Sequence, residues 1–315
     1  MEGRIDVHHH IMPPQYVETM GEGPIGSPSV SRKVPVWTRD SATEILDKYG
    51  IARAITSISA PGVLLSDAKD TARLARLCND YSARLAQHYP GRFGTFASLP
   101  LPDVAASIQE CDYALDVLKV EGIVLMTNYR DKYLGDPEFA PLMDHLNARD
   151  AIVFVHPTNC SCGDCHPAAS ASLLEFPFDT TRTIVSLLLS RTLERCPNIR
   201  FIFSHGGGAV PYLAGRLTGL LARNPMLDTP LNVNALLRGL YYDTALSATR
   251  PVFAALREIT SIEHILFGTD YPFAPDPQVG ATLKGLKEAG LDEREVRMVE
   301  SENARRLLVP VRERS

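Results

Sequence analysis

The feature that most constrains the fold is a regular alternation of short apolar, β-branched runs with longer amphipathic stretches along the chain. The runs show little alternation of polar and apolar residues, which is typical of strands buried on both faces of a parallel sheet. Eight runs predict strands at residues 4–8, 53–57, 93–98, 122–125, 152–156, 200–204, 240–243 and 265–268. The stretches between them predict helices at residues 41–49, 66–89, 103–118, 138–149, 181–195, 210–222, 250–259 and 277–289.

Eight strands that alternate with eight helices predict an α/β fold, specifically a (β/α)8 TIM barrel. The length of 315 residues would also allow two domains, but no linker or internal repeat divides the chain. We therefore expect one barrel domain over residues 1–315. A doubly wound open sheet gives the same alternation, but no G-x-G-x-x-G motif follows the first run to support it.

Three segments lie outside the minimal barrel pattern. Residues 11–40 contain several Pro, Gly and Ser and predict a long insertion after the first strand, and residues 157–180 predict another after the fifth. Residues 292–308 predict a C-terminal helical extension. Because the loops that follow barrel strands build the active-site face, we expect both insertions to enclose a substrate.

The charge balance argues against several classes of partner. The chain has 32 Lys and Arg against 37 Asp and Glu, a net charge of −5, so we expect neither nucleic acid nor an anionic membrane surface as the main partner. No apolar run approaches the ~20 residues of a membrane span, and the N-terminal segment lacks the apolar core of a signal peptide. Six cysteines in a chain of this length do not indicate a disulfide scaffold. These features predict a soluble, cytoplasmic protein.

Histidine or aspartate stands at the end of four predicted strands. These residues are His8 and His10 on the first strand, His156 on the fifth, His205 on the sixth and Asp270 on the eighth. Strand periodicity places His8 and His10 on one face and turns His9 away. The carboxyl ends of barrel strands meet at the catalytic face, so we expect the side chains to converge there. Two or three imidazoles with one carboxylate suit zinc, or a harder ion such as manganese.

Longer stretches around these residues resemble the amidohydrolase superfamily, in particular its non-oxidative decarboxylase branch. The matching stretches are residues 5–10 with Pro13, 154–158, 176–182, 203–211 and 268–273. That branch includes 2-amino-3-carboxymuconate-6-semialdehyde decarboxylase, γ-resorcylate decarboxylase and 6-methylsalicylate decarboxylase. The resemblance implies that His8, His10, His156 and Asp270 hold one divalent ion. It also implies that His205 stands beside this ion, unligated, as the acid/base histidine.

Comparison of two positions with other members of the superfamily indicates how many ions, and of which kind, to expect. Binuclear members usually carry a carbamylated lysine at the end of strand four, whereas residues 124–128 here contain none, which favours a single ion. His8 occupies the first position, where resorcylate-type relatives carry Glu. This difference favours Zn²⁺, with Mn²⁺ as the alternative.

Four residues on the predicted catalytic face are candidates for substrate binding. Asn128 and Tyr129 follow strand four, and Phe273 follows strand eight, where they are placed to contact a planar substrate. Arg32, or its neighbour Lys33, lies in the first insertion and is a candidate partner for a substrate carboxylate. A solvated surface charge is the other interpretation of these two residues.

The second insertion contains a cluster of three cysteines. Cys160, Cys162 and Cys165 precede His166 in the pattern C-x-C-x-x-C-H. The spacing between the first two is too tight for a standard zinc knuckle, and no distant cysteine pair accompanies them. We expect thiols that shape the pocket or simply pack, rather than a second metal site.

The resemblance to the decarboxylase branch implies a metal-dependent, oxygen-independent decarboxylase. The expected substrate is an ortho-hydroxylated aromatic acid such as 6-methylsalicylate or a dihydroxybenzoate, with His205 and Asp270 as catalytic residues and CO₂ as a product. The alternative is a metal-dependent hydrolase of a lactone, ester or amide in the same superfamily. A metal-binding or assembly protein without activity is a third interpretation, although no expected site residue is lost. The resemblance also implies a homodimer or a higher homo-oligomer.

Overall fold

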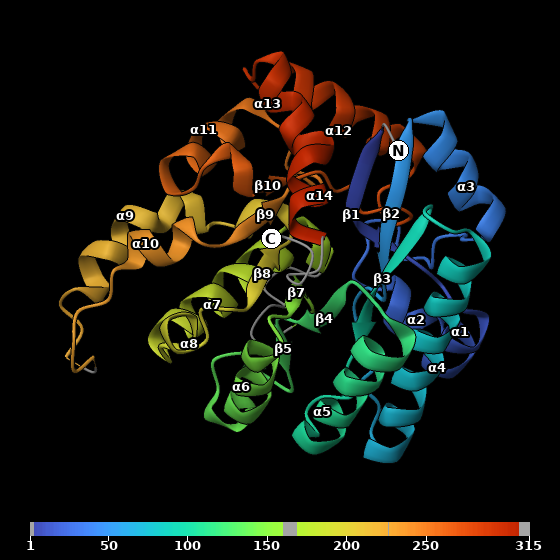
Figure 1. Ribbon diagram of the computed structural model, residues 1–315, viewed down its shortest axis with the longest axis horizontal. Coiled ribbons are helices and arrows are strands. Elements are labelled where there is room, and N and C mark those ends of the chain that lie inside the picture. The colour runs from blue at the N-terminus through green and yellow to red at the C-terminus, as the bar shows by residue number, and fades with distance from the viewer. Residues whose placement is uncertain (1–2, 160–168, 226, 309–315) are drawn as a thin grey trace.

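The computed structural model describes residues 3–159, 169–225 and 227–308. Its main sheet has eight parallel strands in the order β1-β2-β3-β4-β7-β8-β9-β10 (Figure 1). These strands are β1 (Arg4–His10), β2 (Ile51–Ser57), β3 (Phe93–Ser98), β4 (Gly122–Met126), β7 (Ile152–His156), β8 (Arg200–Phe203), β9 (Tyr241–Asp243) and β10 (Ile265–Leu266). The amide of Val7 donates to the carbonyl of Phe267, and that of His10 to the carbonyl of Tyr271. These bonds bring the last strand against the first, and the predicted (β/α)8 barrel is confirmed.

Helices follow the strands around the outside of the barrel (Figure 1). They are α3 (Arg39–Lys48), α4 (Ala68–His88), α5 (Val104–Asp112), α6 (Ala140–Ala148), α7 (Glu175–Leu189), α8 (Thr192–Arg195), α9 (Val210–Leu221), α10 (Val233–Arg238), α11 (Arg250–Ile259) and α12 (Asp276–Glu288). The longest, α4, begins at a side-chain cap, because Asp67 accepts hydrogen bonds from two amides of the first turn. Its apolar face is buried, which fixes the helix against the sheet.

The barrel interior is filled by large side chains. All residues of β3, β4 and β7 are buried, as expected for strands covered on both faces. Phe96 and Phe154 stack inside with their ring centroids 5.6 Å apart. The barrel is therefore a packed core rather than a pore, and in barrels of this kind ligands bind at the carboxyl ends of the strands.

The first insertion contains two short helices, α1 (Pro14–Met20) and α2 (Glu22–Gly26). Gly26 allows a tight loop after α2, because a Cβ atom there would lie only 2.9 Å from the carbonyl carbon of Lys33. The amide of Ser172, in the second insertion, donates to the carbonyl of Pro28 at 3.0 Å. The two insertions therefore contact each other.

Several elements differ from the sequence prediction, and three of these differences are as follows. Helix α7 begins at Glu175 rather than at residue 181, because Pro177 stands in the first turn, where a missing amide hydrogen removes no intrahelical bond. A short antiparallel pair, β5 (Asn128–Tyr129) and β6 (Lys132–Tyr133), follows β4. Residues 293–308 form α13 (Glu293–Arg297), a π-helical turn and α14 (Asn303–Leu308) instead of one uniform helix.

None of the described helices is both long and apolar enough to cross a membrane.

The cysteines of the second insertion, Cys160, Cys162 and Cys165, and the neighbouring His166, lie outside the described residues.

Candidate active site

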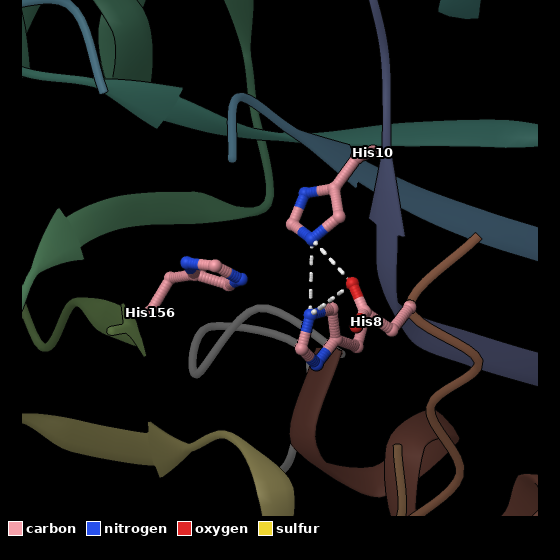
Figure 2. A group of neighbouring side chains, drawn as sticks. His8, His10 and His156 are labelled. Atoms are coloured by element: carbon pink, nitrogen blue, oxygen red, sulfur yellow. Dashed lines mark hydrogen bonds and ion pairs between the residues drawn. The ribbon is translucent and has the colours of Figure 1, made fainter. Parts of the chain in front are cut away.

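Four side chains converge at the carboxyl end of the barrel. The ligand atoms of His8, His10, His156 and Asp270 all lie within 4.8 Å of one another. The two imidazoles of β1 approach with their Nε2 atoms 3.0 Å apart, and His156 faces them from the end of β7 (Figure 2). Asp270 Oδ1 lies 3.1 Å from Nε2 of His10 and 3.4 Å from Nε2 of His8. The structure thus brings together the four residues that the sequence predicts as metal ligands.

Each of the three imidazoles is oriented by a bond at its other nitrogen. His8 Nδ1 donates to Asp243 Oδ2 at 2.7 Å, and His156 Nδ1 donates to the carbonyl of Pro157 at 2.8 Å. His10 Nδ1 lies 3.3 Å from the carbonyl and 3.2 Å from the hydroxyl of Ser57. With Nδ1 engaged, Nε2 of each ring keeps its lone pair for a ligand, which is the usual arrangement of metal-binding histidines.

His9 points away from this cluster, as the strand periodicity predicts. Its Nδ1 bonds to Asp6 Oδ2 at 3.0 Å. Asp6 also accepts hydrogen bonds from the amides of His8 and Thr269 and from the hydroxyl of Thr269. This buried carboxylate therefore ties the first strand to the segment that carries Asp270.

Asp243 is a site residue that the sequence analysis did not identify. Its Oδ1 accepts from the amides of His205 and Ala245, while its Oδ2 holds His8. The available signal was its position, because Asp243 ends the seventh predicted strand as the other site residues end theirs. Its carboxylate couples a predicted metal ligand to the backbone of the predicted acid/base residue.

The backbone is strained at two of these residues. His205 has a φ of 54° and Asp270 a φ of 62°, conformations that cost non-glycine residues about 1–3 kcal/mol. The turn after His205 requires glycine at Gly208, where a Cβ atom would lie 2.1 Å from the carbonyl oxygen of Pro177. The strained turns aim both side chains into the same space.

His205 lies beside the cluster without belonging to it. Its Nε2 is 3.6 Å from Asp270 Oδ2, and its ring centroid lies 5.1 Å from that of His8. Its Nδ1 is buried and has no hydrogen-bond partner among the described residues. His205 therefore lacks the orienting bond that each of the three clustered imidazoles has.

The pKa values of the four clustered residues shift in different directions. Burial disfavours a cationic His8, but the carboxylates of Asp243 and Asp270 raise its pKa to about 10. Burial lowers the pKa of His10 and holds that of His156 well below its usual range. Burial also opposes ionisation of Asp270, but His8 and the bonds from neighbouring histidines hold its pKa well below normal. The two carboxylates thus create a buried site that favours a cation.

A cavity of about 720 Å³ opens above the cluster, and His156, His205 and Asp270 form part of its lining. Both insertions contribute to the walls, through residues that include Val30 and Leu173. This size and position are typical of a small-molecule site.

The predicted substrate residues have different positions relative to this cavity. Phe273 lines it. Asn128 and Tyr129 are not among its described lining residues: the amide of Asn128 bonds to Asp179 Oδ2, and the hydroxyl of Tyr129 accepts from the amide of Met126. Arg32 is likewise not among them, whereas its neighbour Lys33 lines the cavity. The short hairpin of β5 and β6 keeps Asn128 and Tyr129 packed in the protein.

Comparison with known proteins identifies the family. The amidohydrolase family profile matches residues 5–309. The chain belongs to the amidohydrolase family. It is 37% identical to the decarboxylase yanB of Aspergillus niger over 93% of this chain and 83% of the relative. It is also 35% identical to the 6-methylsalicylic acid decarboxylase acuB of Aspergillus aculeatus, over 91% of this chain and 94% of the relative.

Solved structures agree with this family assignment. A crystal structure of an amidohydrolase II superposes with a TM-score of 0.91 at 28% identity and covers 98% of this chain and all of that chain. A dihydroxybenzoic acid decarboxylase from Polaromonas sp. JS666, solved with manganese and 2-nitroresorcinol, superposes with a TM-score of 0.82. At 21% identity, over 98% of this chain and 97% of that chain, the second likeness shows the shared fold.

Proposed function

We propose that this amidohydrolase-family protein is a metal-dependent decarboxylase that acts without oxygen on ortho-hydroxylated aromatic acids. The observation that carries the proposal is the convergence of three imidazoles and one carboxylate at the base of a cavity, with His205 beside them. The decarboxylase relatives support it, including the one that acts on 6-methylsalicylic acid.

The donor atoms fit a single divalent ion held by His8, His10, His156 and Asp270. Three nitrogen donors and one carboxylate suit zinc, which we propose as the resident ion. Manganese is the alternative, supported by its presence in the Polaromonas decarboxylase. A bound ion supplies positive charge that orients the carboxylate and adjacent hydroxyl of the substrate and stabilises developing negative charge.

The reaction itself needs a proton at a ring carbon. Direct loss of CO₂ from an aromatic ring would leave an electron pair in the ring plane, where the π-system does not accept it. Protonation of the carbon that bears the carboxylate avoids this problem at the expense of aromaticity. Aromaticity returns when the carbon–carbon bond breaks and CO₂ leaves, so the chain must provide a placed proton donor.

His205 is the proposed donor, with Asp270 as its partner. Imidazole gives and takes protons near neutral pH, and His205 lines the cavity. Because the pKa of Asp270 is held well below normal, this residue serves as an anion near His205 and not as the proton donor. The 3.6 Å between His205 Nε2 and Asp270 Oδ2 lets the carboxylate stabilise the protonated imidazole.

The experiment that tests this function measures CO₂ release by the zinc- and manganese-loaded protein. The substrates are 6-methylsalicylate and 2,6-dihydroxybenzoate. A lactone, an ester and an amide of similar size are assayed separately as substrates of the alternative hydrolase. We expect CO₂ from the acids under anaerobic conditions, and none from the His156→Ala variant. Hydrolysis of the lactone, ester or amide without decarboxylation of either acid would contradict the proposal and favour the hydrolase alternative.

A further inference from the structure

The active-site cavity is larger than a simple salicylate requires. Its volume of about 720 Å³ lies in the upper part of the ~300–1,000 Å³ range of small-molecule sites. An ortho-hydroxybenzoate that carries one methyl group occupies less than half of this space. The remaining volume therefore lies beyond the ring, on the side away from the clustered histidines and Asp270.

The lining of the cavity is largely apolar, with several serines among it. We define its rim by three large side chains that line the cavity and are nevertheless exposed: Val30, Leu173 and Leu246 are 77%, 68% and 45% accessible to solvent. When a ligand covers exposed apolar side chains that line a cavity, the burial of this surface favours binding. Lys33 is the only lysine or arginine among the described lining residues, and it is exposed.

Two of the rim residues are held near each other by the backbone. The bond from the amide of Ser172 to the carbonyl of Pro28 joins the segments that carry Leu173 and Val30. The tight packing of Gly26 against Lys33 further restricts the loop on the Val30 side. The apolar rim is thus an ordered part of the active-site cavity, fixed by backbone contacts.

We propose that the substrates are ortho-hydroxylated aromatic acids whose ring carries an apolar chain longer than a methyl group, and that the rim of Val30, Leu173 and Leu246 binds this chain. The inference rests on the proposed decarboxylation for the orientation of the acid group. The occupant is part of the substrate, because the apolar surface is continuous with the cavity that contains His205 and Asp270.

The test compares salicylates with methyl, propyl and pentyl chains, placed in separate series at ring positions 4 and 6. In at least one series kcat/KM rises with chain length, by up to about fourfold for each methylene group that becomes buried. In the double variant Val30→Ser, Leu173→Ser, the ratio of kcat/KM for the pentyl acid to that for the methyl acid falls at least about tenfold. The matched control, Val36→Ser with Leu174→Ser, alters two exposed apolar residues that do not line the cavity and keeps the ratio.

Two results would overturn the inference. One is a pentyl-to-methyl ratio at or below one in both series of the unaltered protein. The other is an equal ratio in the rim variant and the control. If no acid is decarboxylated, the proposed function fails, and calorimetry of the metal-loaded protein with the same acids tests the rim separately. Tighter binding of the pentyl acid, lost only in the rim variant, then supports the rim, and equal affinities reject it.

Discussion

At the scale of single residues, the site is defined by which nitrogen of each imidazole is engaged. His8, His10 and His156 have Nδ1 bonded to a carboxylate, serine or backbone carbonyl, so their Nε2 atoms converge. His205 has no such bond among the described residues. The proposed roles of metal ligand and acid/base residue therefore coincide with a difference in the bonding of Nδ1.

The first prediction concerns metal retention. His156→Ala removes one of three nitrogen donors and is expected to lose most of the bound metal and the activity while the barrel stays folded. His9→Ala is the matched control, because His9 bonds Asp6 on the other face of β1 and should keep its metal. Elemental analysis and circular dichroism of both variants provide the measurement. Full metal content in the His156 variant would refute the ligand assignment.

The second prediction separates acid/base chemistry from ligation at His205. His205→Asn should keep near one metal ion per chain, while turnover falls about 10²–10⁴-fold, the usual contribution of a general acid–base residue. If His205 were instead a fourth nitrogen ligand, with Asp270 in the acid/base role, metal and turnover would be lost together. Metal analysis paired with steady-state rates decides between these two assignments.

The third prediction concerns Asp243, which supports two site residues at once. Asp243→Asn keeps the size of the side chain but removes the anion that orients His8 and accepts the amide of His205. Loss of such an orienting partner typically lowers metal affinity about 10–100-fold. Chelator competition measures the affinity. An unchanged dissociation constant would show that Asp243 is only a structural residue.

At the scale of elements, the sequence predicts best where a feature depends on local pattern. Buried parallel strands are recognised from their apolar runs, and because such strands share a carboxyl end, residues as distant as His8 and Asp270 are expected to meet. The burial of Asn128 and Tyr129 was not predictable in this way, because it depends on the β5–β6 hairpin and on a partner in α7. Asp243 ends a predicted strand as the other site residues do, but the groups that it contacts across the barrel are visible only in the structure.

The first turns of α7 connect several parts of the site. Asp179 is fully buried and accepts hydrogen bonds from Thr127, Asn128 and Tyr133, which follow β4. Thr127 in turn accepts from the amide of Thr158, two residues after His156. This helix end therefore fixes the loop next to His156, a proposed metal ligand.

The fourth prediction tests this connection. Asp179→Ala removes the acceptor of two buried donors, Thr127 and Asn128, and of the half-buried Tyr133 hydroxyl, and should lower the free energy of unfolding by at least about 2 kcal/mol. Thr180→Val is the matched control, because the Thr180 hydroxyl is buried without a hydrogen-bond partner among the described residues, and its loss should be nearly neutral. Urea denaturation measures both variants. Equal midpoints would refute a special role for Asp179.

At the scale of the whole molecule, the last prediction is association of the chain into at least a homodimer. Large apolar side chains are exposed on outer helices, among them Phe178 on α7 and both Tyr212 and Leu220 on α9. The net charge of −5 gives little repulsion between copies of a 315-residue chain. Light scattering at micromolar concentration should therefore give a mass of at least twice 34.6 kDa. Because apolar contacts are not screened by salt, this mass should persist from about 0.1 M to about 1 M NaCl. A mass near 34.6 kDa at every salt concentration would exclude association, and dissociation only at high salt would show that charged contacts hold the copies together.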